Sequence, residues 1–178
     1  MSRWRQKLDL VAVALAAVSF AAACAPSETG VFQTQTGDPV IAISEGACAS
    51  TCPVYDLTLR PDGRYLLNGE RFVKATGVTE GNVGTNAWTA ADAVLKSAEF
   101  WTMKEIQTPR TLPNCQTGAP TVRVTWRTGE GKEKTVIYDA GCGVERTREM
   151  ISALRVAMRF DDLVWTNDTF DPATGERS

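Results

Sequence analysis

The stretch Cys48-Ala-Ser-Thr-Cys52-Pro53-Val54-Tyr55 constrains the fold of this chain more than any other part of the sequence. It combines two cysteines that can close a small ring, a proline with a fixed φ angle, and the start of an alternating strand. Tyr55, Leu57 and Leu59 alternate with polar residues, which is the period of a strand with one buried and one solvent-exposed face. Because Pro61-Asp-Gly63 favours a tight turn, a hairpin is predicted here.

Hydrophobic spacing predicts the other elements, and turn residues separate them. Asn68-Gly69 is a second turn signal, and residues 104–120 contain three prolines and no apolar period, which predicts a long loop. Arg155 is expected on the polar side of the last helix. The predicted further strands cover residues 40–43, 64–67, 71–76, 121–126 and 135–138, and the predicted helices cover residues 90–99 and 145–160.

This order of elements predicts an α+β fold. Strands that follow one another in hairpins, with helices set apart from them, are typical of an antiparallel sheet with helices on one side. We expect five to six strands from two hairpins, with two helices packed on one face.

The N-terminus has the features of an export signal. Arg3, Arg5 and Lys7 precede an apolar run that ends at Cys24, and this run is shorter than the roughly 20 residues of a membrane-spanning helix. We therefore divide the chain into a signal peptide (1–23), a lipidated flexible tether (24–38), a single disulfide-linked α+β domain (39–165) and a polar tail (166–178).

Cys24 is the predicted lipidation site. Ala21-Ala-Ala-Cys24 resembles the bacterial lipobox, in which the cysteine is acylated and becomes the new first residue after cleavage. Secretion by simple cleavage at the same place is the alternative. The resemblance implies a cell-envelope protein that is anchored in the membrane through this lipid and faces the periplasm, and Ala25 after the cysteine favours the outer membrane.

Composition argues against several classes of function. The formal net charge is −2, and no basic cluster follows the export signal, so nucleic acid is not an expected partner. The chain contains no histidine, which removes the Ser-His-Asp and Cys-His catalytic systems and the histidine-containing zinc sites. We identify no catalytic residue, metal ligand or cofactor site, and we expect a protein that is not an enzyme.

Four cysteines remain after Cys24, and disulfides persist in exported proteins. If Gly129-Glu-Gly131 forms the turn of the second hairpin, Cys115 and Cys142 emerge together at its open end. We therefore favour the pairs Cys48–Cys52 and Cys115–Cys142. The two crossed pairings, free thiols and a metal site stay open as alternatives.

The Cys-x-x-x-Cys-Pro motif also raises a chemical alternative. It resembles the Cu(I)-carrying motif of thioredoxin-like copper chaperones, in which two thiolates suit the soft ion. In those proteins the motif opens a helix and a distant histidine is the third ligand. Here it opens a predicted strand and histidine is absent, so a structural ring is favoured over thiol-redox or Cu(I) chemistry at Cys48 and Cys52.

The residues from Cys48 to Gly69 carry a family resemblance. The Cys-x-x-x-Cys-Pro-Val-Tyr motif, the alternating strand, Asp62-Gly63 and Asn68-Gly69 resemble the opening of a family of small exported bacterial domains of unknown function, many of them lipoproteins. The resemblance covers Val40 to about Phe160 and implies an exported α+β domain without a known activity. We expect a binding or structural module with an envelope protein or glycan as its partner.

Overall fold

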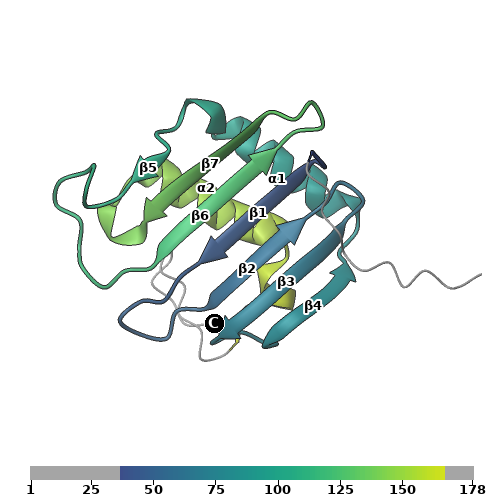
Figure 1. The fold of residues 1–178 in the computed structure, drawn as a ribbon, viewed down its shortest axis with the longest axis horizontal. Helices are drawn as coiled ribbons and strands as arrows, with labels where there is room; N and C mark the ends of the chain where they lie inside the picture. The colour runs from purple at the N-terminus through teal and green to yellow at the C-terminus, as the bar shows by residue number, and fades with distance from the viewer. Residues whose placement is uncertain (1–36, 167–178) are drawn as a thin grey trace, which may run out of the picture. The chain divides into compact units, whose positions relative to one another are not determined.

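The computed structural model describes residues 37–166, which form one sheet with helices behind it (Figure 1). The predicted signal peptide, Cys24, the tether up to residue 36 and the tail after Thr166 lie outside the described residues. Among the described residues, no helix has both the length and the apolar character that crossing a membrane requires.

Seven strands pair in the order β4-β3-β2-β1-β6-β7-β5. Every neighbouring pair is antiparallel except β5 and β7, which are parallel. The strands are β1 (Val40–Glu45), β2 (Val54–Leu59), β3 (Arg64–Arg71), β4 (Gly77–Asn82), β5 (Ile106–Gln107), β6 (Thr121–Arg127) and β7 (Glu133–Asp139).

Two long helices, α1 (Thr85–Ser97) and α2 (Glu145–Ala157), pack against each other behind the sheet (Figure 1). A short helix α3 (Phe160–Leu163) and two 3-10 turns, η1 (Phe100–Thr102) and η2 (Ala140–Cys142), complete the regular structure. The α+β class is confirmed. The sheet, however, is mixed and has seven strands, and the described residues contain three α-helices where we expected two.

The core lies between the sheet and the helices. Alternate residues of the central strands point into it, among them Ile41, Leu57 and Val124, each at most 1% exposed. Burial of a side chain of this size contributes about 1.5–3 kcal/mol to stability. The opposite face of the sheet carries the polar residues of the same alternation, and neither long helix covers it (Figure 1).

Both predicted hairpins are present. In the first, the Gly63 amide donates to the Arg60 carbonyl (3.0 Å) between β2 and β3. In the second, the Gly131 amide donates to the Thr128 carbonyl (3.0 Å) between β6 and β7.

The predicted turn at Asn68-Gly69 is wrong. Both residues lie inside β3, opposite Asp56 and Tyr55, and the chain turns later, so that the next strand covers 77–82 and not 71–76. A Cβ on Gly69 would lie 2.1 Å from the Ala75 carbonyl oxygen. Glycine is therefore needed here for close packing of the turn after β3, and the local turn signal is overridden by strand pairing.

The helix boundaries and the loop of residues 104–120 also differ from expectation. Helix α1 begins at Thr85 because Ala87 extends the buried stripe one turn earlier. The last helix ends at Ala157, since Arg159 adopts a left-handed conformation (φ 63°) before α3. The two-residue strand β5 lies within the predicted loop, and its length is too short for a periodic signal.

Candidate functional site

The structure pairs the cysteines as favoured from the sequence, with disulfides Cys48–Cys52 and Cys115–Cys142. Both lie at the same end of the sheet, because β1 ends, β2 and β6 begin and β7 ends there. Cys52 is buried and leads through Pro53 directly into β2, whereas Cys48 is half-buried in the loop. The Cys48–Cys52 ring therefore precedes a strand, unlike the copper-carrying motif, which opens a helix.

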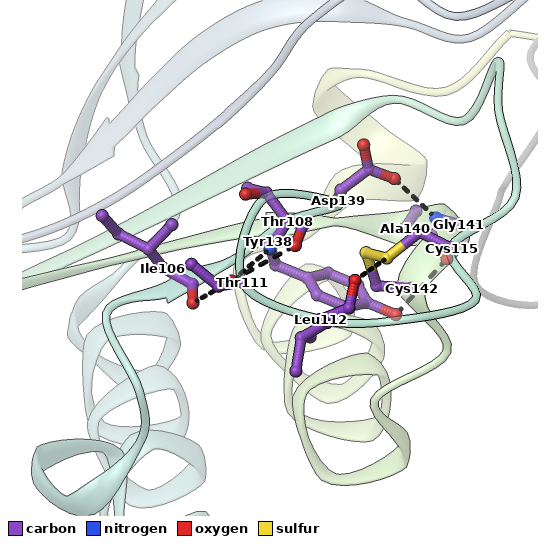
Figure 2. The surroundings of a disulfide bond; sticks show 10 residues. All are labelled: Ile106, Thr108, Thr111, Leu112, Cys115, Tyr138, Asp139, Ala140, Gly141 and Cys142. Carbon is purple, nitrogen blue, oxygen red and sulfur yellow. Dashed lines mark hydrogen bonds between the residues drawn. A yellow bond between two sulfur atoms is a disulfide. The ribbon is translucent and has the colours of Figure 1, made fainter.

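The second disulfide holds the long loop of residues 104–120 against the end of β7 (Figure 2). The Gln116 amide donates to the Gly141 carbonyl (2.8 Å), and the Gly141 amide donates to the Asp139 carboxylate (2.9 Å). A Cβ on Gly141 would lie 2.1 Å from the Gln116 carbonyl oxygen, so only glycine allows this approach. The Thr111 hydroxyl donates to the Ile106 carbonyl (2.8 Å) and closes the loop on itself.

A polar groove of about 400 Å³ lies at this end of the helix-free face. Four of its residues, Asn68, Asp56, Ser44 and Arg123, are aligned partners on β3, β2, β1 and β6. The register of the sheet therefore produces a polar row across four strands. We define the polar groove by Ser44, Asp56, Asn68, Glu70, Thr121 and Arg123.

A buried ion pair lies on the helix side of the same sheet end. Arg155 Nη2 of α2 is 2.5 Å from Glu45 Oε2 of β1, and the two side chains are 3% and 0% exposed. The Tyr55 hydroxyl donates to the same carboxylate oxygen (3.3 Å). The Arg155 guanidinium also lies 5.3 Å from the centre of the Trp165 ring. These contacts connect the end of β1 to α2 and to the last described residues.

Burial raises the pKa of Tyr55 well above its usual value, and the charge of Glu45 raises this pKa further. The hydroxyl therefore stays protonated, as its role as donor to Glu45 requires. Tyr55 also packs edge-on against Phe160, with ring centres 5.2 Å apart. The cluster joins β1 and β2 to α2 and α3, and Glu45 and Tyr55 also lie at the base of the polar groove.

The predicted position of Arg155 on the polar helix side is wrong, and the buried pair was missed. Signals for it were nevertheless present in the sequence. Glu45 continues the alternation of Ile41 and Ile43, which places it on the core face. Arg155 follows the buried Leu154 and lies four residues after Ile151, so it belongs to the apolar stripe of α2.

Chemically, the polar groove offers carboxylates, an amide, hydroxyls and one guanidinium, a set suited to hydrogen bonding with a polar partner. Within residues 37–166, no three or more Cys, Asp or Glu side chains lie together in a way that would hold a metal ion. The lipidation site Cys24 is outside the described residues.

Comparison with known proteins identifies one family. Residues 39–158 match the family described as "Domain of unknown function (DUF6438)". No curated protein matches the chain. Since the match spans well over half of the sequence, this chain belongs to the DUF6438 family, a domain of unknown function.

Proposed function

We propose that this chain is a lipid-anchored protein of the bacterial cell envelope whose α+β domain is a binding or structural module and not an enzyme. The observation that carries the binding role is the polar groove on the helix-free face, next to two disulfides. An envelope protein or glycan is the proposed partner. The periplasm is an oxidising compartment in which such disulfides persist.

The groove is suited to binding because its side chains stand on strands and not on long loops. Asp56 and Arg123 are exposed, and their positions follow from the pairing of β2, β1 and β6. Less conformational freedom is lost when a partner binds to a surface that is already ordered. The adjoining Cys48–Cys52 ring and the Cys115–Cys142 link limit local opening of the same sheet end.

The anchor is proposed to be the lipid on Cys24. Fully extended, a tether of residues 25–38 would span roughly 45–50 Å at about 3.5 Å per residue, which lets the domain reach partners some distance from the membrane surface. Outer-membrane sorting is proposed from Ala25, which follows the cysteine.

Replacement of Cys24 tests the anchor. The wild-type chain is expected in the membrane fraction, with a mass that shows cleavage before Cys24 and added acyl chains. Cys24→Ser is expected to lose the acyl mass and to leave the membrane fraction. If Cys24→Ser stays in the membrane with an unchanged mass, lipidation at this residue is wrong.

Crosslinking in the native envelope tests the groove. We expect Asp56→Asn combined with Arg123→Gln to lose partners that crosslink to the wild-type protein. The matched control is Glu149→Gln combined with Arg110→Gln, which makes the same two chemical changes at exposed positions outside the groove. Equal crosslinking of both double variants would refute a binding role for the polar groove.

Thiol counting tests the competing proposal of redox or Cu(I) chemistry at Cys48 and Cys52. The structural role predicts no reactive thiol in the exported protein and no reduction by periplasmic dithiols. Stoichiometric Cu(I) that is lost in Cys52→Ser would support the competing proposal instead.

A further inference from the structure

A second pocket lies at the opposite end of β6 from the polar groove. It has a volume of about 490 Å³ and lies between α1, η1 and the turn that joins β6 to β7. Three tryptophans from three different elements line it, Trp88 of α1, Trp101 of η1 and Trp126 of β6. We call this cavity the tryptophan pocket. Its volume lies within the range of about 300–1,000 Å³ that is usual for small-molecule sites.

The indole rings of the tryptophan pocket are held in place by ring packing and by hydrogen bonds to the backbone of η1. Trp101 stacks on Trp126, with ring centres 4.9 Å apart and an interplanar angle of 29°, and Phe100 packs edge-on against both rings. The Lys134 ammonium donates to the carbonyls of Trp101 (2.9 Å) and Met103 (2.5 Å), which fixes the backbone of η1. Trp126 is 3% exposed, whereas Trp88 and Trp101 are half-buried and present the accessible indole surface.

Polar groups of both signs surround this apolar surface. Lys132 Nζ lies 4.0 Å from the centre of the Trp101 ring. Asp92 is paired with Lys96 (2.5 Å), and Glu130 is exposed on the β6–β7 turn. The pocket thus combines aromatic faces with hydrogen-bond donors and acceptors at their edges.

A buried hydroxyl supports the presence of a ligand site. Thr128 lines the tryptophan pocket, and its Oγ1 atom is buried without a hydrogen-bond partner among residues 37–166. Buried hydroxyls in native proteins nearly always have a partner, either protein, water or ligand. A ligand hydroxyl would supply one once rotation of the Thr128 side chain turns Oγ1 toward the pocket.

The balance of charges selects the class of ligand. The lining contains three carboxylates, from Asp92, Glu99 and Glu130, and two ammonium groups, from Lys96 and Lys132. The carboxylates repel a strongly anionic ligand, and the two ammonium groups repel a cationic one. A neutral molecule with both hydroxyl groups and a flat apolar face satisfies all of these groups.

We propose that the tryptophan pocket binds a saccharide and that its pyranose rings lie against the indoles of Trp88 and Trp101. The C–H faces of the sugar replace water on the aromatic surface, while its hydroxyls bond to Glu130, Thr128 and Lys132. The exposed Lys132 side chain moves from the Trp101 ring to the edge of the sugar. This inference rests on the proposed envelope binding function for the source of the glycan.

Titration of the purified full chain with chitotetraose and with soluble glycan strands from the cell wall tests this proposal. We expect saturable binding that shifts the indole N–H NMR signals of Trp88 and Trp101. Trp88→Ala is expected to weaken binding by at least about tenfold, equivalent to about 1.4 kcal/mol. Glu130→Gln and Lys132→Met, both on an exposed turn and away from the core, are expected to weaken it severalfold, which keeps the test valid if Trp88→Ala fails to fold.

Phe72→Ala is the matched control, because Phe72 is 40% exposed and follows β3 at the opposite end of the sheet. It is expected to bind as the wild type does. The proposal is overturned if neither glycan binds at millimolar concentration, if the pocket variants bind as tightly as the wild type, or if choline or inorganic phosphate binds in place of the glycans.

The outcomes also separate this proposal from the proposed function. If Cys24 lipidation and crosslinking through the polar groove persist while glycan binding fails, only the saccharide site is wrong. If lipidation and crosslinking both fail while the purified chain still binds glycan through Trp88, the saccharide site stands and the proposed anchoring and groove are wrong.

Discussion

Loss of the Arg155 guanidinium is the sharpest test of how this domain is held together. In Arg155→Met the apolar length of the side chain is kept, but the Glu45 carboxylate, 0% exposed, loses the cation that lies 2.5 Å away. Breaking a buried ion pair on one side lowers the free energy of unfolding by about 3–5 kcal/mol, because a buried charge is left behind. We expect a loss of this size, with a thermal midpoint about 10 °C lower or more.

Urea unfolding followed by circular dichroism measures this change. The double variant Glu45→Met with Arg155→Met removes both charges, so we expect it to be much more stable than Arg155→Met alone. Arg148→Met is the matched control, because Arg148 and Glu145 also lie 2.5 Å apart but are 44% and 62% exposed. We expect only a small change for this control, since water and salt screen an exposed pair.

Two results would refute this reasoning. A loss below about 1 kcal/mol in Arg155→Met would mean that the pair is not desolvated in solution. A double variant as unstable as the single one would mean that Arg155 acts through packing and not through its charge.

Further predictions concern the disulfides and Tyr55. On the chain-entropy model, replacing Cys115 and Cys142 by serine lowers the free energy of unfolding by about 3.6 kcal/mol, because this disulfide has a sequence separation of 27. Replacing Cys48 and Cys52, with a separation of 4, lowers it by about 2 kcal/mol. Urea unfolding that ranks the two pairs in the reverse order would contradict this prediction. The raised pKa of Tyr55 predicts that the contribution of its hydroxyl to the free energy of unfolding is constant below pH about 10. Above this pH the contribution falls by about 1.4 kcal/mol per pH unit, because the unfolded chain releases a proton that the folded chain retains. In Tyr55→Phe this part of the loss of stability at alkaline pH should disappear. If the free energy of unfolding changes with pH between 8 and 11 in the same way in Tyr55→Phe and in the wild type, Tyr55 titrates normally and the prediction is wrong.

Local patterns of apolar and turn residues in the sequence were enough to predict the class of the fold. The alternation in β2 and β6 predicted one buried and one polar face, because successive side chains of a strand point to opposite sides. Turn chemistry at Gly63 and Gly131 placed both hairpins. These features depend on residues only a few positions apart, so they can be read without knowledge of the rest of the chain.

Local patterns misled where a distant contact was decisive. Asn68-Gly69 has strong turn chemistry, but pairing with β2 and the close approach of Ala75 keep it inside β3. The register that aligns Asn68, Asp56, Ser44 and Arg123 in the polar groove depends on three strand pairings at once. The sequence predicted a solvent-exposed face of the sheet, but it did not predict which side chains of that face would be neighbours.

The sequence by itself determined the strand and helix periods, the main turns and the resemblance to a family of domains of unknown function. Only the tertiary structure decided that Glu45 and Arg155, 110 residues apart, form a buried pair, and that three tryptophans from α1, η1 and β6 line one pocket. The physical reason is that such groupings depend on how α1, α2 and η1 are placed against the sheet. That placement follows from the packing of the whole core, which no short stretch of sequence encodes.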